Sequence, residues 1–367
     1  MEIKAQEEKV QKRTVKHGPH FTLQWHLTAK CDQSCMHCYM HDSPTYAQEL
    51  SEELNYEDCC KIIDDFSDTF DNWGMPTRIS FTGGDPLLRE DFFDLIAYAR
   101  KRGIEIGILG NPNHLDYETA KRLKDLGVSR YQVSIDGLEK THDRLRGRKG
   151  LFKDTIRAIH VLEDVGIPSV VMFTLSRENA NELIRVIQTV AREGVSIFDF
   201  ARIVPIGAGK QLKEQMLTPS EYRELLLKIL EEYKRLQENG SRTYFGRKDH
   251  LWKLLYQQLG LLKLLLPKDK ETIYNGCGIG SGILTILADG TVYACRRLPV
   301  EIGRVPGQTI REIFINSPEH NKMRQVENMQ KCSKCELIQF CRGCPAVAYG
   351  TCGDYMAADP QCWKELK

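Results

Sequence analysis

The chain lacks a surplus of charge of either sign. Its 51 Lys and Arg residues are balanced by 50 Asp and Glu residues, which gives a formal net charge of +1. Proteins that bind nucleic acids or anionic membrane surfaces generally carry a clear excess of positive charge. We therefore expect neither a nucleic acid nor a membrane among the partners of this protein.

An export signal and long apolar runs are also lacking. Residues 1–18 are rich in Lys and Glu and contain no apolar core segment. The most apolar window, residues 251–266, is interrupted by Lys and Gln, whereas a membrane helix needs about 18 consecutive apolar residues. These absences predict a cytoplasmic protein.

Cysteine, in contrast, is abundant, with 13 residues in a chain of 367. An odd number of cysteines without an export signal argues against a disulfide framework and favours metal or cluster ligation. The length suits one large catalytic domain with an appended module, and the hydrophobic content of 41% predicts a sizeable core.

The first part of the chain alternates between strand-like and helix-like segments. Strands are expected at residues 21–27, 78–82, 105–109, 130–135, 169–174 and 197–202. Helices are expected from Asn55, which can cap the first of them, and at residues 91–102, 117–126, 151–165 and 180–192. Such β–α repeats imply an α/β fold whose parallel sheet curves into an incomplete barrel, with the chemistry at the C-terminal strand ends.

The pattern changes after residue 202. A Pro/Gly turn at 204–210 is followed by a capping box at Thr218 and Glu221, which predicts another helix. A Leu-rich helical stretch covers 250–266, and residues 283–287 and 291–295 read as a hairpin. We expect an N-terminal extension, a barrel, a helical bridge and a Cys-rich domain, bounded as 1–20, 21–210, 211–270 and 271–367.

The first cysteine group, Cys31-x3-Cys35-x2-Cys38, follows the first expected strand directly. Three thiolates can hold three irons of a 4Fe–4S cluster and leave the fourth iron open to another ligand. The alternative is a zinc site, for which a nearby histidine would supply the fourth ligand: His26, His37 or His41.

These cysteines, with Tyr39 beside the last of them, resemble the signature of the radical S-adenosylmethionine (SAM) superfamily. The segment from Thr82 through Gly83, Gly84 and Asp85 to Pro86 resembles the family's Gly-Gly-acid segment, whose backbone meets the SAM amino group. Glycine suits that role because backbone can approach a ligand where no Cβ intervenes. The resemblance implies a partial (β/α)6 TIM-like barrel, with the SAM cluster on Cys31, Cys35 and Cys38.

Further positions carry the resemblance along the chain. Ser134 and Asp136 match residues near the SAM ribose and carboxylate, and residues 142–147 are typical of the same subgroup. Taken alone, an Asp before Gly is equally a turn residue. The resemblance also implies SAM contacts after the fifth and sixth strands, at Thr174, Asn179, Arg202 and Val204.

A second cysteine set lies in the C-terminal quarter: Cys277, Cys295, Cys332, Cys335, Cys341, Cys344 and Cys362. Paired C-x2-C motifs signal a metal without selecting it, so two zinc knuckles are an alternative. The arrangement resembles the SPASM domain, an extension with two auxiliary 4Fe–4S clusters. The resemblance implies a nearer cluster on Cys277, Cys295 and Cys344, and a farther one on Cys332, Cys335, Cys341 and Cys362.

The match departs from the SPASM pattern in two places. Two residues rather than three separate Cys341 from Cys344, and no cysteine precedes Cys277 closely. The nearer cluster therefore has either an open iron, which could bind a substrate thiolate, or Cys352 as its fourth ligand. Cys59 and Cys60 fall outside both sets and are expected to be packing residues.

The resemblance implies that SAM is cleaved to a 5′-deoxyadenosyl radical, which removes a hydrogen atom from the substrate. Because SPASM-bearing relatives most often modify ribosomally made peptides, we expect a peptide maturase that forms a thioether at a substrate Cys. The alternatives are a small molecule such as a tetrapyrrole, formylglycine-type protein maturation, or a zinc-stabilised binding module without activity.

The expected partners follow from that hypothesis. They are a precursor peptide and a flavodoxin- or ferredoxin-like electron donor. Residues 1–20 are too few for a leader-binding domain. A separate protein or the helical bridge would then hold the leader, if it is held at all. No catalytic acid or base stands out.

Overall fold

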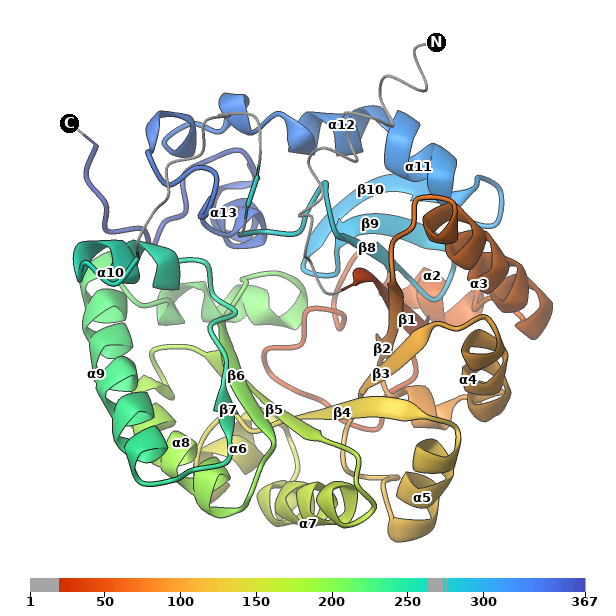
Figure 1. Ribbon diagram of the computed structural model, residues 1–367, viewed down its shortest axis with the longest axis horizontal. Helices are drawn as coiled ribbons and strands as arrows, with labels where there is room; N and C mark the ends of the chain where they lie inside the picture. The colour runs from red at the N-terminus through yellow and green to blue at the C-terminus, as the bar shows by residue number, and fades with distance from the viewer. Residues whose placement is uncertain (1–19, 263–272, 275, 367) are drawn as a thin grey trace.

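The centre of the fold is one open sheet in the order β10-β9-β8-β1-β2-β3-β4-β5-β6-β7. The structure is a computed structural model that describes residues 20–262, 273–274 and 276–366. The strands β1 to β7 run parallel to one another. Their bounds are Phe21–Thr28, Thr77–Gly83, Glu105–Leu109, Val128–Ser134, Ser169–Leu175, Ile197–Arg202 and Tyr244–Phe245. The predicted incomplete barrel is confirmed, with the sheet curved into an arc (Figure 1).

Helices cover the outside of this arc (Figure 1). They are α3 (Tyr56–Asp71), α4 (Phe92–Lys101), α5 (Tyr117–Asp125), α7 (Leu151–Asp164), α8 (Leu183–Arg192) and α9 (Pro219–Glu238). The predicted caps form: Asn55 accepts the Asp58 N–H, and Thr218 and Glu221 make a capping box. None of the helices that the structure describes is long and apolar enough to cross a membrane.

Short helices occupy the loops between these elements. They are α2 (Tyr46–Ser51), α6 (Glu139–Leu145) and α10 (Trp252–Gln258), with 3-10 turns at Pro86–Leu88, Ala180–Glu182 and Gly207–Gln215. The helix predicted over 250–266 is wrong in length, because α10 ends at Gln258 and Gly260 adopts a φ of 68°. The last part of that stretch lies outside the described residues.

The C-terminal quarter extends the barrel sheet. The predicted hairpin forms from β8 (Ile283–Ile286) and β9 (Thr291–Cys295), and β10 (Leu298–Arg304) adds a strand that the sequence did not reveal. β8 pairs in parallel with β1, with Leu284 opposite Leu23. The remaining elements are α11 (Ile310–Asn316), α12 (Pro318–Arg324), α13 (Pro345–Cys352) and 3-10 turns at Val326–Asn328 and Cys332–Lys334. The domain boundaries given above remain predictions.

Side-chain packing joins the two halves. Phe314 of α11 lies edge-on to Phe21 of β1, with ring centroids 5.2 Å apart. Phe70 of α3 stacks on Phe21 at 3.8 Å and lies edge-on to Phe314 at 6.0 Å. All three rings are buried. The hydrophobic core is therefore continuous from the barrel into the C-terminal region.

Candidate active site

The carboxyl ends of the parallel strands open into one cavity of about 1150 Å³, a volume that includes solvent at its mouth. This is the end of the barrel where chemistry was expected. The cavity brings together most of the predicted site residues: Cys31, Cys35, Cys38, Tyr39, Thr82, Gly83, Gly84, Ser134, Thr174, Arg202 and Val204. Asp85, Asp136 and Asn179 are not among its lining residues.

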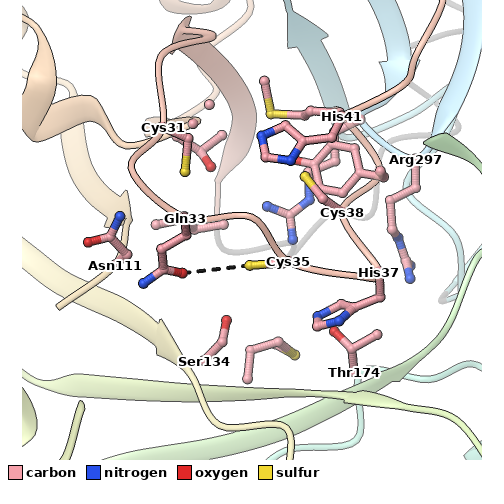
Figure 2. A pocket seen from close by; sticks show the side chains of 18 of the residues that line it. Cys31, Gln33, Cys35, His37, Cys38, His41, Asn111, Ser134, Thr174 and Arg297 are labelled. Atoms are coloured by element: carbon pink, nitrogen blue, oxygen red, sulfur yellow. Dashed lines mark hydrogen bonds between the residues drawn. The ribbon is translucent and has the colours of Figure 1, made fainter. Parts of the chain in front are cut away.

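The three N-terminal cysteines lie around the same space, opposite Ser134 and Thr174 (Figure 2). The Cys35 Sγ is 3.6 Å from the Gln33 Oε1 and 3.8 Å from the Arg146 Nη1. Burial raises the pKa of Cys31 to about 12, and the neighbouring Cys35 and Cys38 add to this shift. Iron would stabilise such crowded thiolates, so this donor set fits a cluster with one open iron.

The loop that carries these thiols is anchored at several points. The Asp32 carboxylate accepts hydrogen bonds from the side-chain amides of Asn111 and Asn113 at 2.7 and 2.8 Å, and it pairs with His114. The Met36 N–H donates to the Leu145 carbonyl. The cysteine loop is therefore held against the ends of β3 and α6.

The histidines that the sequence offered as zinc ligands have other neighbours. The His26 Nε2 lies 3.1 Å from the Tyr39 hydroxyl, and the His37 Nε2 lies 3.1 Å from the Asp136 Oδ2. His41 lines the cavity and packs against Tyr46. Within the described ranges, no three His, Cys, Asp or Glu side chains are grouped to hold a single metal ion.

Gly83 and Gly84 let the end of β2 lie directly against the cysteine loop. A Cβ on Gly84 would be 1.9 Å from the Lys30 carbonyl oxygen, and Gly83 has a φ of 129°. Asp85 points into the fold, where its Oδ1 accepts the Leu87 N–H and burial raises its pKa to about 7. The SAM contact of Asp85 remains a prediction.

Asp136 is buried next to Arg146 and Thr174, which line the cavity. Its buried carboxylate lies 2.6 Å from the Arg146 guanidinium and accepts the Thr174 N–H at 2.6 Å. Burial acts to raise the pKa of Asp136, but Arg146 and His37 outweigh it and hold the pKa well below its usual range. Asn179 donates to the carbonyls of Asp136 and Thr174, both at 2.9 Å. Both predicted residues thus fix the ends of β4 and β5, and their SAM contacts remain predictions.

The Arg202 side chain links the end of β6 to the segment before α10 and to the C-terminal region. The guanidinium, which is buried, donates to Asp249 at 2.7 Å and binds both carboxylate oxygens of Asp359 at 2.7 and 2.8 Å. The same Asp359 carboxylate accepts the backbone N–H of Cys344 at 2.8 Å. Arg202 therefore connects the end of β6 to a predicted cluster ligand, and its SAM contact remains a prediction.

Several C-terminal thiols lie near enough to influence one another electrostatically. Burial raises the pKa of Cys277 to about 12, with further contributions from nearby Cys344 and Cys295. In the other predicted group, burial raises the pKa of Cys332 to about 11, with contributions from Cys362 and Cys335. Burial raises the pKa of Cys341 to about 12, and nearby Asp249, Asp359 and Cys332 add to this shift. The ligand assignments remain predictions.

The other C-terminal and helical cysteines lie apart from these groups. Cys352 is exposed, and its thiol donates to the Ala348 carbonyl within its own helix at 3.2 Å. Cys59 is fully buried in the core, and Cys60 packs against it from the edge. The structure therefore gives no support to Cys352 as a fourth ligand of the nearer group.

Sequence reasoning missed three cationic residues that line the cavity: Lys248, Arg296 and Arg297. Lys248 follows β7, and the two arginines connect β9 to β10. The position of both arginines beside Cys295 was a usable signal. No sequence signal pointed to Lys248, because only the folding of the chain brings this residue to the cavity.

Comparisons with known proteins agree with this geometry. Residues 25–190 match the model of the radical SAM superfamily, and residues 277–345 match the iron–sulfur cluster-binding SPASM domain. An AdoMet-dependent heme synthase of Methanosarcina barkeri is 30% identical over 93% of this chain and 95% of its own length. An Fe-coproporphyrin III synthase of the same organism is 29% identical, covering 92% and 86%.

Two further similarities are to a maturase and to a solved structure with bound S-adenosylmethionine. The mycofactocin maturase MftC of Mycolicibacterium smegmatis is 25% identical over 93% of this chain and 82% of its own length. The crystal structure of Streptococcus suis SuiB bound to S-adenosylmethionine has a TM-score of 0.74 at 16% identity, covering 98% of this chain and 81% of SuiB. That last likeness concerns the fold.

Proposed function

Because this chain belongs to the radical SAM superfamily and carries a SPASM domain, we propose that it modifies a tetrapyrrole with carboxylate side chains. SAM and the 4Fe–4S clusters of such an enzyme supply the radical that removes a hydrogen atom from an unactivated carbon. The observation that carries the proposal is the similarity to a heme synthase over 93% of the chain. That similarity includes the C-terminal region as well as the shared barrel.

The cavity is lined by residues from both the barrel and the C-terminal region. Barrel residues such as Ser134 and Thr174 face it from one side, and Arg297 from the C-terminal region faces it from another (Figure 2). Both regions of the chain therefore face the space in which SAM and a substrate would meet.

The chemical change that we propose is oxidative decarboxylation of propionate side chains. Conversion of Fe-coproporphyrin III to heme replaces propionates by vinyl groups. Each converted side chain would lose one hydrogen atom to the 5′-deoxyadenosyl radical, one CO2 molecule, and one electron, which an iron–sulfur cluster of the C-terminal region would accept. The residues around the cavity would orient the propionate so that the carbon that loses hydrogen faces SAM.

A ribosomal peptide is the second candidate substrate, supported by the similarity to mycofactocin maturase over 93% of the chain. Thioether formation at a substrate Cys, a precursor-peptide partner and a separate leader-binding protein belong to this candidate. Formylglycine-type maturation is a variant of it. A flavodoxin- or ferredoxin-like donor and a cytoplasmic location are predictions common to both candidates.

Anaerobic incubation with SAM, dithionite and Fe-coproporphyrin III tests the first candidate. We expect 5′-deoxyadenosine together with porphyrin products whose masses show stepwise loss of CO2 and hydrogen. The Cys31→Ala variant should produce neither, whereas Cys60→Ala should match the wild type, since Cys60 lies outside both cysteine sets. Formation of 5′-deoxyadenosine with an unchanged porphyrin mass would refute the tetrapyrrole. Loss of two hydrogens from a Cys-containing peptide would establish the second candidate instead.

A further inference from the structure

Three positive side chains reach the cavity from outside the barrel strands that hold the predicted SAM site. Lys248 comes from the segment between β7 and α10, and Arg296 and Arg297 come from the β9–β10 connection. Figure 2 shows Arg297 extending toward the space near His37 and Thr174. Segments far apart in sequence thus place their cations at one side of one cavity.

These cations have no acidic partner at ion-pair distance among the residues that the structure describes. The Arg297 Nη1 donates only to the Arg202 carbonyl at 3.3 Å, and the Arg296 guanidinium lies 5.6 Å from the centre of the Tyr39 ring. Asp199 accepts the backbone N–H of Lys248 at 3.2 Å and attracts its charge from a distance. The other arginines of the cavity are paired: Arg146 with Asp136, and Arg202 with Asp249 and Asp359.

The three charges repel one another, although Cys344, Cys295 and Asp249 also attract the charge of Arg297. Although Lys248 touches solvent through the cavity, the surrounding protein lowers its pKa to about 7, and repulsion by Arg296 and Arg297 adds to that effect. Like charges held together in this way favour an anionic ligand. Guanidinium groups are suited to carboxylates because they can donate two parallel hydrogen bonds.

We propose that Lys248, Arg296 and Arg297 bind the carboxylate side chains of the substrate and so set its orientation against SAM. This inference rests on the proposed function, because a porphyrin with several propionates offers several carboxylates to one cationic wall. The SAM molecule itself brings a single carboxylate, too little negative charge for three cations. Holding some of the propionates at these three cations would direct another propionate toward the barrel.

Equilibrium binding tests this without turnover. Fe-coproporphyrin III and its methyl ester are titrated separately into anaerobic holoenzyme, and the Soret band is followed. We expect the wild type to bind the ester about 10–100-fold more weakly than the acid, since hydrogen bonds to charged groups are of that strength. Lys248→Gln and Arg296→Gln should weaken binding of the acid by a similar factor and leave binding of the ester unchanged.

Matched variants separate charge from packing. Lys248→Arg keeps the charge and should retain most of the affinity, and Lys228→Gln, on the exposed face of α9, should match the wild type. Iron content and SAM affinity of the Gln variants should equal those of the wild type. A fall in either would overturn the inference, because the cations would then serve the cofactors.

The remaining outcomes distinguish this inference from the proposed function. Equal affinity of the wild-type protein for acid and ester would overturn carboxylate recognition while leaving porphyrin modification intact. Failure of the wild type to bind either porphyrin would overturn both. The comparison of acid with ester uses only the wild-type protein, so it stands even where a variant fails to fold.

Discussion

Replacement of Arg202 by Met tests the connection between the barrel and the C-terminal region. The substitution keeps an apolar stem of similar length and removes the guanidinium. Asp249 and Asp359, both buried, then lose the cation that they share. The Cys344 N–H keeps its acceptor, but that acceptor is no longer fixed from the opposite side.

The magnitude follows from burial. Removing one partner of a buried ion pair costs about 3–5 kcal/mol, because the remaining charge is left without compensation. An unfolding entropy of about 2.1 cal/mol/K per residue over 367 residues gives roughly 0.8 kcal/mol/K. The melting temperature of Arg202→Met should therefore fall by about 4–6 °C.

The assay is thermal unfolding of anaerobically purified holoenzyme at one fixed scan rate, since large proteins often unfold irreversibly. Arg192→Met is the matched control, because Arg192 is 70% exposed and pairs with Glu193 at the surface. Such exposed pairs contribute about 0–1 kcal/mol, so this control should melt within roughly 1 °C of the wild type. If Arg202→Met melts like the control, the Arg202 network does not stabilise the fold.

Two further predictions concern a cysteine and a histidine. The Cys352→Ala variant should keep the full iron content, because the Cys352 thiol is exposed and donates to the Ala348 carbonyl within its own helix. The Cys344→Ala variant should lose iron. Loss of iron from Cys352→Ala would instead identify Cys352 as a ligand. Burial and Arg324 hold the pKa of His320 well below its usual value of 6.5. Below pH 6.5 the unfolded chain therefore binds a proton at His320 that the folded protein does not bind, and the free energy of unfolding falls. Melting temperatures between pH 7 and pH 5, values chosen around that ordinary pKa, should decline less steeply in His320→Gln, and identical slopes would contradict this assignment.

The barrel was predictable because its signals are local. Apolar strand segments, capping residues such as Asn55 and Thr218, and glycines after the helices all lie next to the elements that they define. β10 was missed because its segment contains Pro299 and Gly303, which indicate a turn rather than a strand. β7 is only two residues long, too short for any periodic pattern.

The site was predictable in part for the same reason. The spacing of Cys31, Cys35 and Cys38 lies within one loop, and the structure places all three at one cavity. Lys248 and the partners of Arg202 could not be found in this way. Arg202 meets Asp359 across 157 positions of sequence, and such a contact is set by tertiary packing.

The pairing of β8 with β1 determines how the two halves can move. A linker would allow them to swing, but here main-chain hydrogen bonds join them through a strand at the middle of the sheet. Iron–sulfur clusters held by the barrel cysteines and by the C-terminal cysteines would then keep a constant separation during turnover. A shortened chain ending after α10 would leave one edge of β1 without a paired strand, and exposed strand edges pair with other chains. Such a fragment should aggregate rather than behave as an independent barrel.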